Sequence, residues 1–153
     1  MYKKIAFTAV LVSLFSGCAS VPLESEEASS RAKQYEAPKD GYAGLYIYRD
    51  SSIGGALKKD IWVNDECVGE SAPNVFFYKQ VEAGKGTKIT TESEFSPNDL
   101  IIDTESGKNY YIEQYIKLGV FVGGANLKQV SEGEGQEDIT PLKLAKPGKC
   151  SKK

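Results

Sequence analysis

Three cysteines are the side chains best suited to covalent chemistry in this 153-residue sequence, and they stand at Cys18, Cys67 and Cys150. The sequence has no histidine, which excludes Ser–His and Cys–His nucleophilic dyads and removes the commonest metal ligand. Carboxylates such as Glu92 and Glu94 share a face at strand spacing and could serve a glycosidase. Exposed carboxylates on a strand more often serve solvation. We therefore expect no enzyme activity, with no catalytic residue, metal ligand or cofactor.

The residues before Cys18 predict how that cysteine is used. A lysine-bearing start is followed by the apolar residues 5–15, a stretch shorter than the roughly 20 residues of a membrane-spanning helix. Its length and flanks are typical of a secretory signal. With the small residues that follow, the pattern resembles the lipobox of bacterial lipoproteins, although Phe15 stands where Leu is usual. The resemblance implies a signal peptide over residues 1–17 and acylation of Cys18, whereas an ordinary signal cleaved beyond Cys18 would leave no lipid.

The residue after Cys18 indicates the destination of a lipoprotein. It is Ala19 rather than the Asp that marks inner-membrane retention in enteric bacteria, so the resemblance favours the outer membrane with a periplasm-facing domain. Display on the cell surface fits the sequence equally. Loss of the signal removes two of the 19 basic residues and leaves 21 acidic ones. This negative balance gives no reason to expect nucleic-acid binding, so the expected partners are the membrane, through the lipid, and an envelope protein or polymer.

With Cys18 assigned to lipid, Cys67 and Cys150 remain as a pair in a compartment that oxidises thiols. A disulfide between them would close a loop of about 84 residues and stabilise the fold by roughly 4–5 kcal/mol on the chain-entropy model. The alternative is two unpaired buried thiols, although the lysine-rich surroundings of Cys150 disfavour burial there. The even count in an extracytoplasmic chain favours the disulfide.

Composition divides the mature chain into three parts. Residues 18–40 are rich in Ser, Glu, Ala and Lys without apolar periodicity, which predicts a lipidated N-terminus on a flexible tether, with partial helix over 26–35 as an alternative. Residues 41–142 carry the apolar patterns of a domain. Residues 143–153 hold five lysines and no acidic residue. We expect this tail to be a solvated, mobile terminus, or else to attract anionic envelope polymers or lipid head groups.

Short apolar and β-branched segments recur through the domain, separated by Gly, Pro and Asn. The Asn64-Asp65 pair suits a tight hairpin turn, and the acidic stretch 132–138 is predicted to be a short helix or a loop without the spacing of an EF-hand calcium site. The regular spacing of seven or eight strands predicts an all-β antiparallel β-sandwich or barrel-like domain. The expected strands are 44–49, 61–63, 66–68, 75–81, 87–91, 100–102, 110–116 and 125–130.

Three segments carry a family resemblance, namely 92–100 (ESEFSPNDL), 107–112 (GKNYYI) and 119–124 (GVFVGG). In this order they resemble a family of bacterial envelope lipoproteins catalogued only as a domain of unknown function, over roughly residues 41–137. The resemblance implies a β-rich domain behind a lipobox and supplies no activity. The hairpin at 63–69 is also similar to the opening of PEGA-like surface domains.

The apolar segment 118–124 is the strongest candidate for a binding role, because glycines bracket Val120, Phe121 and Val122 after the longest strand. As a buried crossover it would belong to the core, and as an exposed patch it would contact a partner. Strand alternation predicts that Val120 and Val122 are buried and that Phe121 is exposed. The sequence thus favours a lipid-anchored, non-catalytic binding or structural module, with an envelope hydrolase that uses carboxylates as the alternative.

Overall fold

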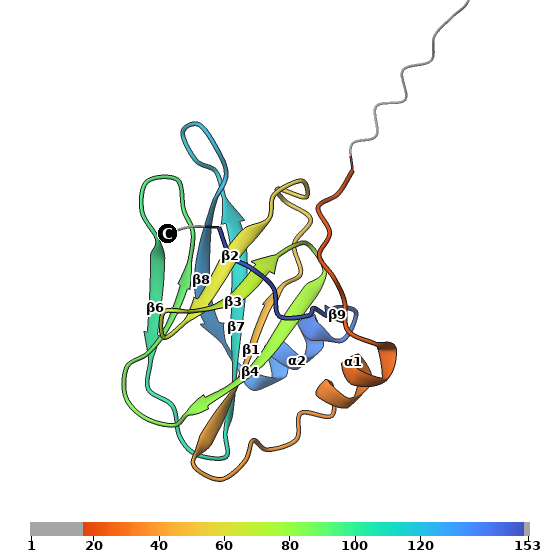
Figure 1. Cartoon of the computed structure of the whole chain (residues 1–153), viewed down its shortest axis with the longest axis vertical. Helices are drawn as coiled ribbons and strands as arrows, with labels where there is room; N and C mark the ends of the chain where they lie inside the picture. Colours follow the sequence, from red (N-terminus) through yellow and green to blue (C-terminus); the bar gives the residue numbers. More distant parts are fainter. Residues whose placement is uncertain (1–16, 152–153) are drawn as a thin grey trace, which may run out of the picture.

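The computed structural model describes residues 17–151, in which two β-sheets face each other (Figure 1). The predicted signal peptide therefore lies outside the described residues, except for Gly17. The five-stranded sheet has the order β8-β7-β1-β4-β9, and the four-stranded sheet has the order β3-β2-β5-β6. In chain order the strands are β1 (Tyr42–Arg49), β2 (Lys59–Val63), β3 (Glu66–Ser71), β4 (Val75–Glu82), β5 (Thr87–Thr91), β6 (Asn98–Ile102), β7 (Asn109–Lys117), β8 (Gly124–Val130) and β9 (Lys143–Leu144).

The predicted all-β sandwich is confirmed. Most neighbouring strands are antiparallel, whereas β1 runs parallel to β7 and β4 runs parallel to β9. The turn between β2 and β3 is also as predicted, because Asn64 and Asp65 both have positive φ, 49° and 66°. Such a two-residue turn matches the twist of the strands that it joins. The Asn64 side chain fixes it further by accepting a hydrogen bond from the backbone N–H of Lys88 at 2.9 Å.

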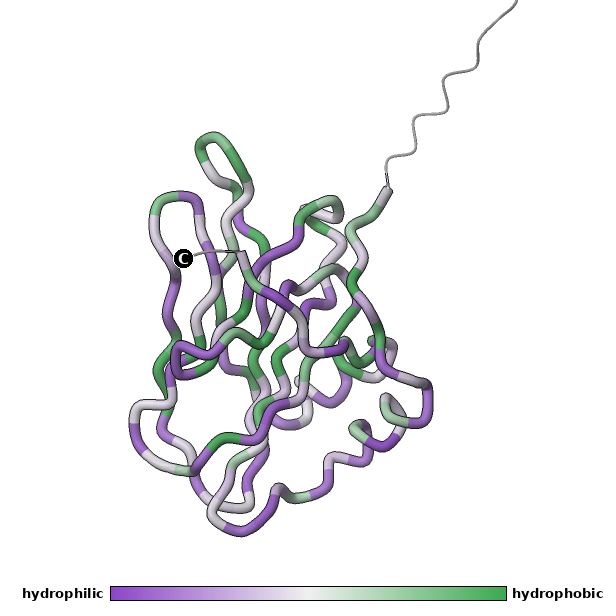
Figure 2. The backbone as a smooth tube through the Cα atoms, in the orientation of Figure 1, coloured by the Kyte–Doolittle hydropathy of each residue, from purple (hydrophilic) through white to green (hydrophobic). Residues whose placement is uncertain are grey.

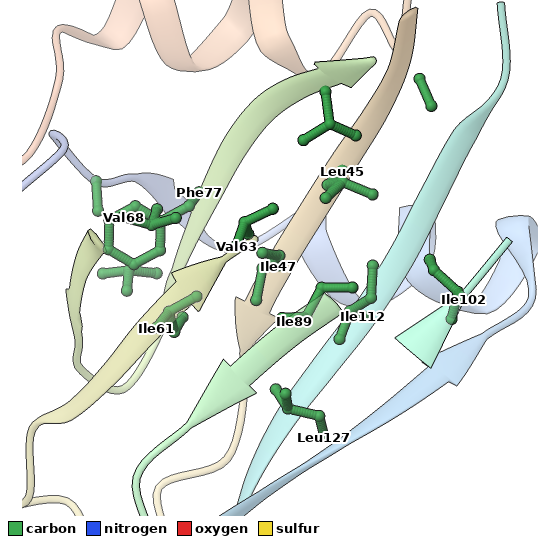
Figure 3. Packing of buried hydrophobic residues seen from close by; sticks show 14 residues of the cluster. Leu45, Ile47, Ile61, Val63, Val68, Phe77, Ile89, Ile102, Ile112 and Leu127 are labelled. Carbon is green, nitrogen blue, oxygen red and sulfur yellow. The ribbon is translucent and has the colours of Figure 1, made fainter. Parts of the chain in front are cut away.

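Strand β1 is buried on both faces. Because successive side chains of a strand point to opposite faces, Leu45 and Ile47 enter the space between the two sheets (Figure 3). Tyr46 and Tyr48 point to the other face of their sheet. The inter-sheet core contains Ala43, Leu45, Ile47, Ile61, Val63, Val68, Val75, Phe77, Val81, Ile89, Ile102, Ile112, Leu127 and Ala145.

A second, aromatic core lies on the outer face of the five-stranded sheet. Tyr46 stacks on Tyr111 with ring centroids 5.2 Å apart, and Tyr35 meets both rings edge-on. Two helices accompany this face, α1 (Glu26–Ala32), which begins at the N-cap Ser25, and α2 (Glu132–Ile139). The acidic stretch is therefore a helix. Between residues 17 and 151, neither helix is long and apolar enough to cross a membrane.

The segment before the domain differs from the expected tether. Leu23 forms a β-bridge with Ala145, the Tyr46 hydroxyl donates to the carbonyl of Ala32 at 2.9 Å, and the Asn109 side-chain amide donates to the carbonyl of Tyr35 at 3.1 Å. Composition predicted disorder because the segment has too little apolar surface to order itself. It becomes ordered because the sandwich offers apolar surface that the segment covers: Ala32 and Tyr35 pack, partly buried, against the aromatic core, and Val21 packs against the inter-sheet core.

The C-terminal tail also differs from the expected mobile terminus, as far as Ser151. Lys143 and Leu144 pair with β4 as β9, and the backbone N–H of Gly148 donates to the carbonyl of Val68 at 2.9 Å. The predicted disulfide is confirmed, with the Cα atoms of Cys67 and Cys150 5.9 Å apart, inside the range that such a bond requires.

Two glycines of α2 give a test of how closely this helix must approach the sheet. A Cβ on Gly135 would lie 2.7 Å from Cδ1 of Tyr111, whereas a Cβ on Gly133 would meet nothing within 4 Å. We expect Gly135→Ala to lower the free energy of unfolding by about 1–2 kcal/mol through overpacking. Gly133→Ala is the matched control and should raise it by about 0.5–1 kcal/mol through helix propensity. Urea denaturation of both variants measures the difference, and equal effects would contradict a close approach of α2 to Tyr111.

Candidate functional site

Three loops stand together at one end of the sandwich, residues 50–58, 92–97 and 118–123 (top of Figure 1). We call them the loop rim. The loops adjoin one another, because a Cβ on Gly123 would meet the Leu57 side chain and a Cβ on Gly119 would meet Glu94. The three loops are far apart in the sequence, so the sequence alone does not reveal this cluster. It forms because β1, β5 and β7 end at the same edge of the sandwich.

The loop rim carries most of the large hydrophobic residues that are exposed, and the hydropathy colouring of Figure 2 marks the tip of loop 118–123 as hydrophobic. Of the eight large hydrophobic residues exposed between residues 17 and 151, six lie in the rim, and a concentration of this kind marks an interaction surface. The six are Ile53, Phe95, Leu118, Val120, Phe121 and Val122.

The prediction for the tip of the β7–β8 loop is right for Phe121 and wrong for Val120 and Val122. Phe121 is 84% exposed, as expected, but Val120 and Val122 are 75% and 55% exposed and not buried. Strand alternation predicted their burial, and it fails because β7 ends at Lys117. Beyond that residue the chain has left both sheets, and all three side chains point into solvent.

Glu94 holds this tip in shape from the neighbouring loop. Its carboxylate accepts hydrogen bonds from the backbone N–H groups of Val120 at 2.6 Å, of Phe121, and of Val122 at 3.3 Å. Partial loss of hydration raises the pKa of Glu94, but the three N–H donors outweigh it and leave the pKa below its ordinary value. Strand spacing had suggested a shared carboxylate site with Glu92. The structure instead gives Glu94 a backbone role, and Glu92 pairs with Lys59 at 3.6 Å.

Arg49 organises the loop between β1 and β2. Its guanidinium is fully buried and donates to the carbonyls of Leu57 at 2.7 Å, Gly54 at 2.8 Å and Ile53 at 3.1 Å. Burial lowers the pKa of Arg49 from its ordinary value, yet a guanidinium stays protonated in proteins. One signal for this role is visible in the sequence, since a basic residue ends a strand whose other residues are mostly apolar.

Cys18 lies beside the loop that Arg49 organises. The backbone N–H of Ala19 donates to the carbonyl of Gly55 at 2.7 Å, so the exposed thiol of Cys18 is fixed one residue away from the loop rim. Cys18 is the free cysteine between residues 17 and 151. The structure therefore brings Cys18 and Phe121, two residues singled out in the sequence, to the same end of the molecule. Cys67 and Cys150 form their disulfide along β3.

A hollow of about 370 Å³ separates two of the rim loops. Glu94, Phe95, Lys117, Leu118 and Val120 line it. Apolar walls with one carboxylate and one ammonium group at the edge suit contact with an apolar surface better than they suit chemistry, since Glu94 already spends both oxygens on backbone N–H groups.

A second carboxylate cluster lies against α2, where Glu113, Glu134 and Asp138 approach one another closely enough to hold a cation. Two of these groups have partners in the protein itself. Lys128 pairs with Glu113 at 2.7 Å, and the buried Tyr48 hydroxyl donates to Asp138 at 2.6 Å. The pairing with Glu113 raises the pKa of Lys128, so the cluster carries its own cation.

Comparison with known proteins places the chain among relatives without an assigned activity. The family described as a protein of unknown function (DUF2846) matches residues 39–125. An uncharacterized protein of Haemophilus influenzae is 62% identical over 132 residues, covering 86% of this chain and 78% of that protein. No solved structure matches the chain. The predicted resemblance to a family of unknown function is thereby confirmed.

The role of Arg49 can be measured through stability. Arg49→Met leaves three partly buried carbonyls without their donor, and we expect the free energy of unfolding to fall by about 3 kcal/mol. Arg31→Met, at an exposed position of α1, is the matched control and should change it by less than about 0.5 kcal/mol. Urea denaturation compares the two, and a loss no larger than that of the control would show that the guanidinium does not hold the loop.

The clamp formed by Glu94 predicts a pH dependence. Because the folded-state pKa of Glu94 lies below its ordinary value of 4.5, its contribution is complete above that value and is lost as the pH falls through the folded pKa. NMR should show the amide signals of Val120 and Phe121 titrating together with a midpoint below 4.5. In Glu94→Gln these amides should lose that titration, whereas Glu92→Gln should retain it. A midpoint at or above 4.5 in the wild-type protein would contradict the clamp.

Proposed function

The chain belongs to the DUF2846 family of proteins of unknown function, and we propose that it is a lipid-anchored outer-membrane protein acting as a non-catalytic binding or structural module that faces the periplasm. One observation carries the proposal. Among three cysteines, Cys67 and Cys150 are consumed by a disulfide, while Cys18 is free, exposed and placed beside the loop rim.

The disulfide supports a location in an oxidising compartment, as the periplasm is. Disulfides persist in oxidising environments such as the bacterial periplasm and are rare in the cytosol. An odd cysteine in a secreted chain suggests a bond to a second chain or a reactive free thiol. Acylation at Cys18, as the lipobox resemblance implies, accounts for the unpaired thiol without a second chain.

The position of the anchor supports a role at the membrane surface. Three acyl chains on Cys18, as in the lipoproteins that the signal resembles, would give an effectively permanent attachment, since each buried methylene contributes about 0.8 kcal/mol. Ala19 favours the outer membrane, and its backbone N–H is bonded to the domain. A domain anchored in this way faces either the periplasm or the outside of the cell. We propose that it faces the periplasm.

The alternative is an envelope hydrolase that uses carboxylates. It needs two converging acids, one of them with a raised pKa so that it can donate a proton. At the loop rim, the pKa of Glu94 is lowered instead, and Glu92 is paired with Lys59. These observations favour a binding or structural role.

The anchor is tested by Cys18→Ser in the full chain, expressed in a bacterial envelope. We expect the variant to leave the membrane fraction or to remain uncleaved, and mass spectrometry of the wild-type N-terminal peptide to find an acylated cysteine. Ser20→Ala, two residues further along, should fractionate as the wild-type protein does. Recovery of mature-sized Cys18→Ser protein in the membrane fraction would overturn the proposal.

A further inference from the structure

We infer that the loop rim itself inserts into the lipid surface that holds the acyl anchor, so that the sandwich stands end-on at the bilayer. The inference rests on the proposed acylation of Cys18 and adds to it a second contact with the membrane. Its occupant is a lipid bilayer, and its contact residues are the apolar side chains of the three rim loops.

The anchor lies very close to the rim. Consecutive Cα atoms are 3.8 Å apart, and the backbone N–H of Ala19 is bonded to Gly55 in the rim loop 50–58. The ordered segment leaves no free length of chain between the lipid attachment point and the domain. Acyl chains on Cys18 therefore enter the bilayer within one residue of the rim, and the rim cannot move away from the lipid surface without breaking this contact.

The surface that would meet the lipid is rich in exposed apolar side chains. Phe95, Leu118 and Phe121 are more than three-quarters exposed and come from two different loops, and Ile53 comes from the third. Apolar side chains in water beside a bilayer are stabilised by entering the boundary between head groups and acyl chains. The other two exposed large hydrophobic residues between 17 and 151, Leu23 and Ile101, lie outside the rim.

A positive charge, unpaired among residues 17–151, lies at the edge of the rim. Lys117 directly precedes Leu118 and is exposed, and it forms no ion pair with a carboxylate of residues 17–151. A lysine at this depth can bury its aliphatic stem and place its ammonium group among lipid phosphates. Two of the three carboxylates in the rim loops have partners in the protein, Glu94 with three backbone N–H groups and Glu92 with Lys59. The third, Asp50 at the start of loop 50–58, is exposed.

The shape of the rim favours a fluid surface over a folded partner. Separate loops stand around a hollow of about 370 Å³, whereas stable protein interfaces need close complementarity at their centre. Lipid chains conform to separate protrusions and need no matching shape. A second copy of this chain and a protein partner are outcomes that the experiment below distinguishes.

The experiment introduces tryptophan at the rim of the full-length acylated protein. Phe121→Trp and Phe95→Trp report from two loops, and Ile101→Trp, exposed on β6 outside the rim, is the matched control. Trp62, the single tryptophan of the chain, is buried and common to all variants. Each protein is reconstituted into vesicles of phosphatidylethanolamine and phosphatidylglycerol, with or without phosphatidylcholine brominated on its acyl chains. Because interfacial apolar groups lie roughly 5–10 Å into the boundary region, bromine should remove about half of the added emission of both rim reporters and leave that of Ile101→Trp unchanged.

The outcomes separate this inference from the proposed function, since mass spectrometry of the same samples reports acylation. Acylated protein whose rim tryptophans escape quenching overturns the inference and leaves the anchor intact. Protein that carries no lipid on Cys18 overturns the proposed function. Rim emission that shifts to the blue without bromine quenching, together with a cross-linked dimer or a cross-linked second protein, assigns the rim to that partner and also overturns insertion.

Discussion

A buried guanidinium determines the conformation of loop 50–58 in the loop rim, and with it the position of Cys18. Arg49 ends β1 fully buried and has backbone carbonyls as hydrogen-bond acceptors. A desolvated cation is costly unless its donors are bonded, so loop 50–58 must keep its carbonyls turned toward Arg49. That requirement presents the carbonyl of Gly55 to Ala19. The position of Cys18 relative to the sandwich thus depends on the buried charge of Arg49 at the end of β1.

The two-sided burial of β1 explains why the chain before the domain is ordered. Leu45 and Ile47 are covered by the opposite sheet, but Tyr46 and Tyr48 need a cover of their own. The aromatic core on that side is completed by Tyr35 from the N-terminal segment and by α2. A segment that could not order itself alone is ordered by the apolar face that it protects, and any lipid on Cys18 is therefore held close to the folded domain.

The sequence predicted those parts of the fold that depend on local pattern. Alternation placed Leu45 and Ile47 on one face, Asn64 and Asp65 formed the turn that their tolerance of positive φ allows, and cysteine count paired Cys67 with Cys150. What it could not predict depends on partners distant in sequence. Composition described residues 18–40 without the sheet that orders them. The loop rim could not be predicted from the sequence, because its loops are separated along the chain and meet only at the ends of their strands.

The two shaped loops of the rim satisfy their backbone in opposite ways. Arg49 binds the carbonyls of loop 50–58, and Glu94 binds the N–H groups at the tip of loop 118–123. Strand pairing no longer satisfies the backbone N–H groups of loop 118–123, because β7 ends at Lys117. Side chains therefore do so, which leaves Val120, Phe121 and Val122 free to point outward together. Period-two alternation predicts burial where a neighbouring strand fixes the backbone. It fails in loop 118–123, where the carboxylate of Glu94 fixes the backbone instead.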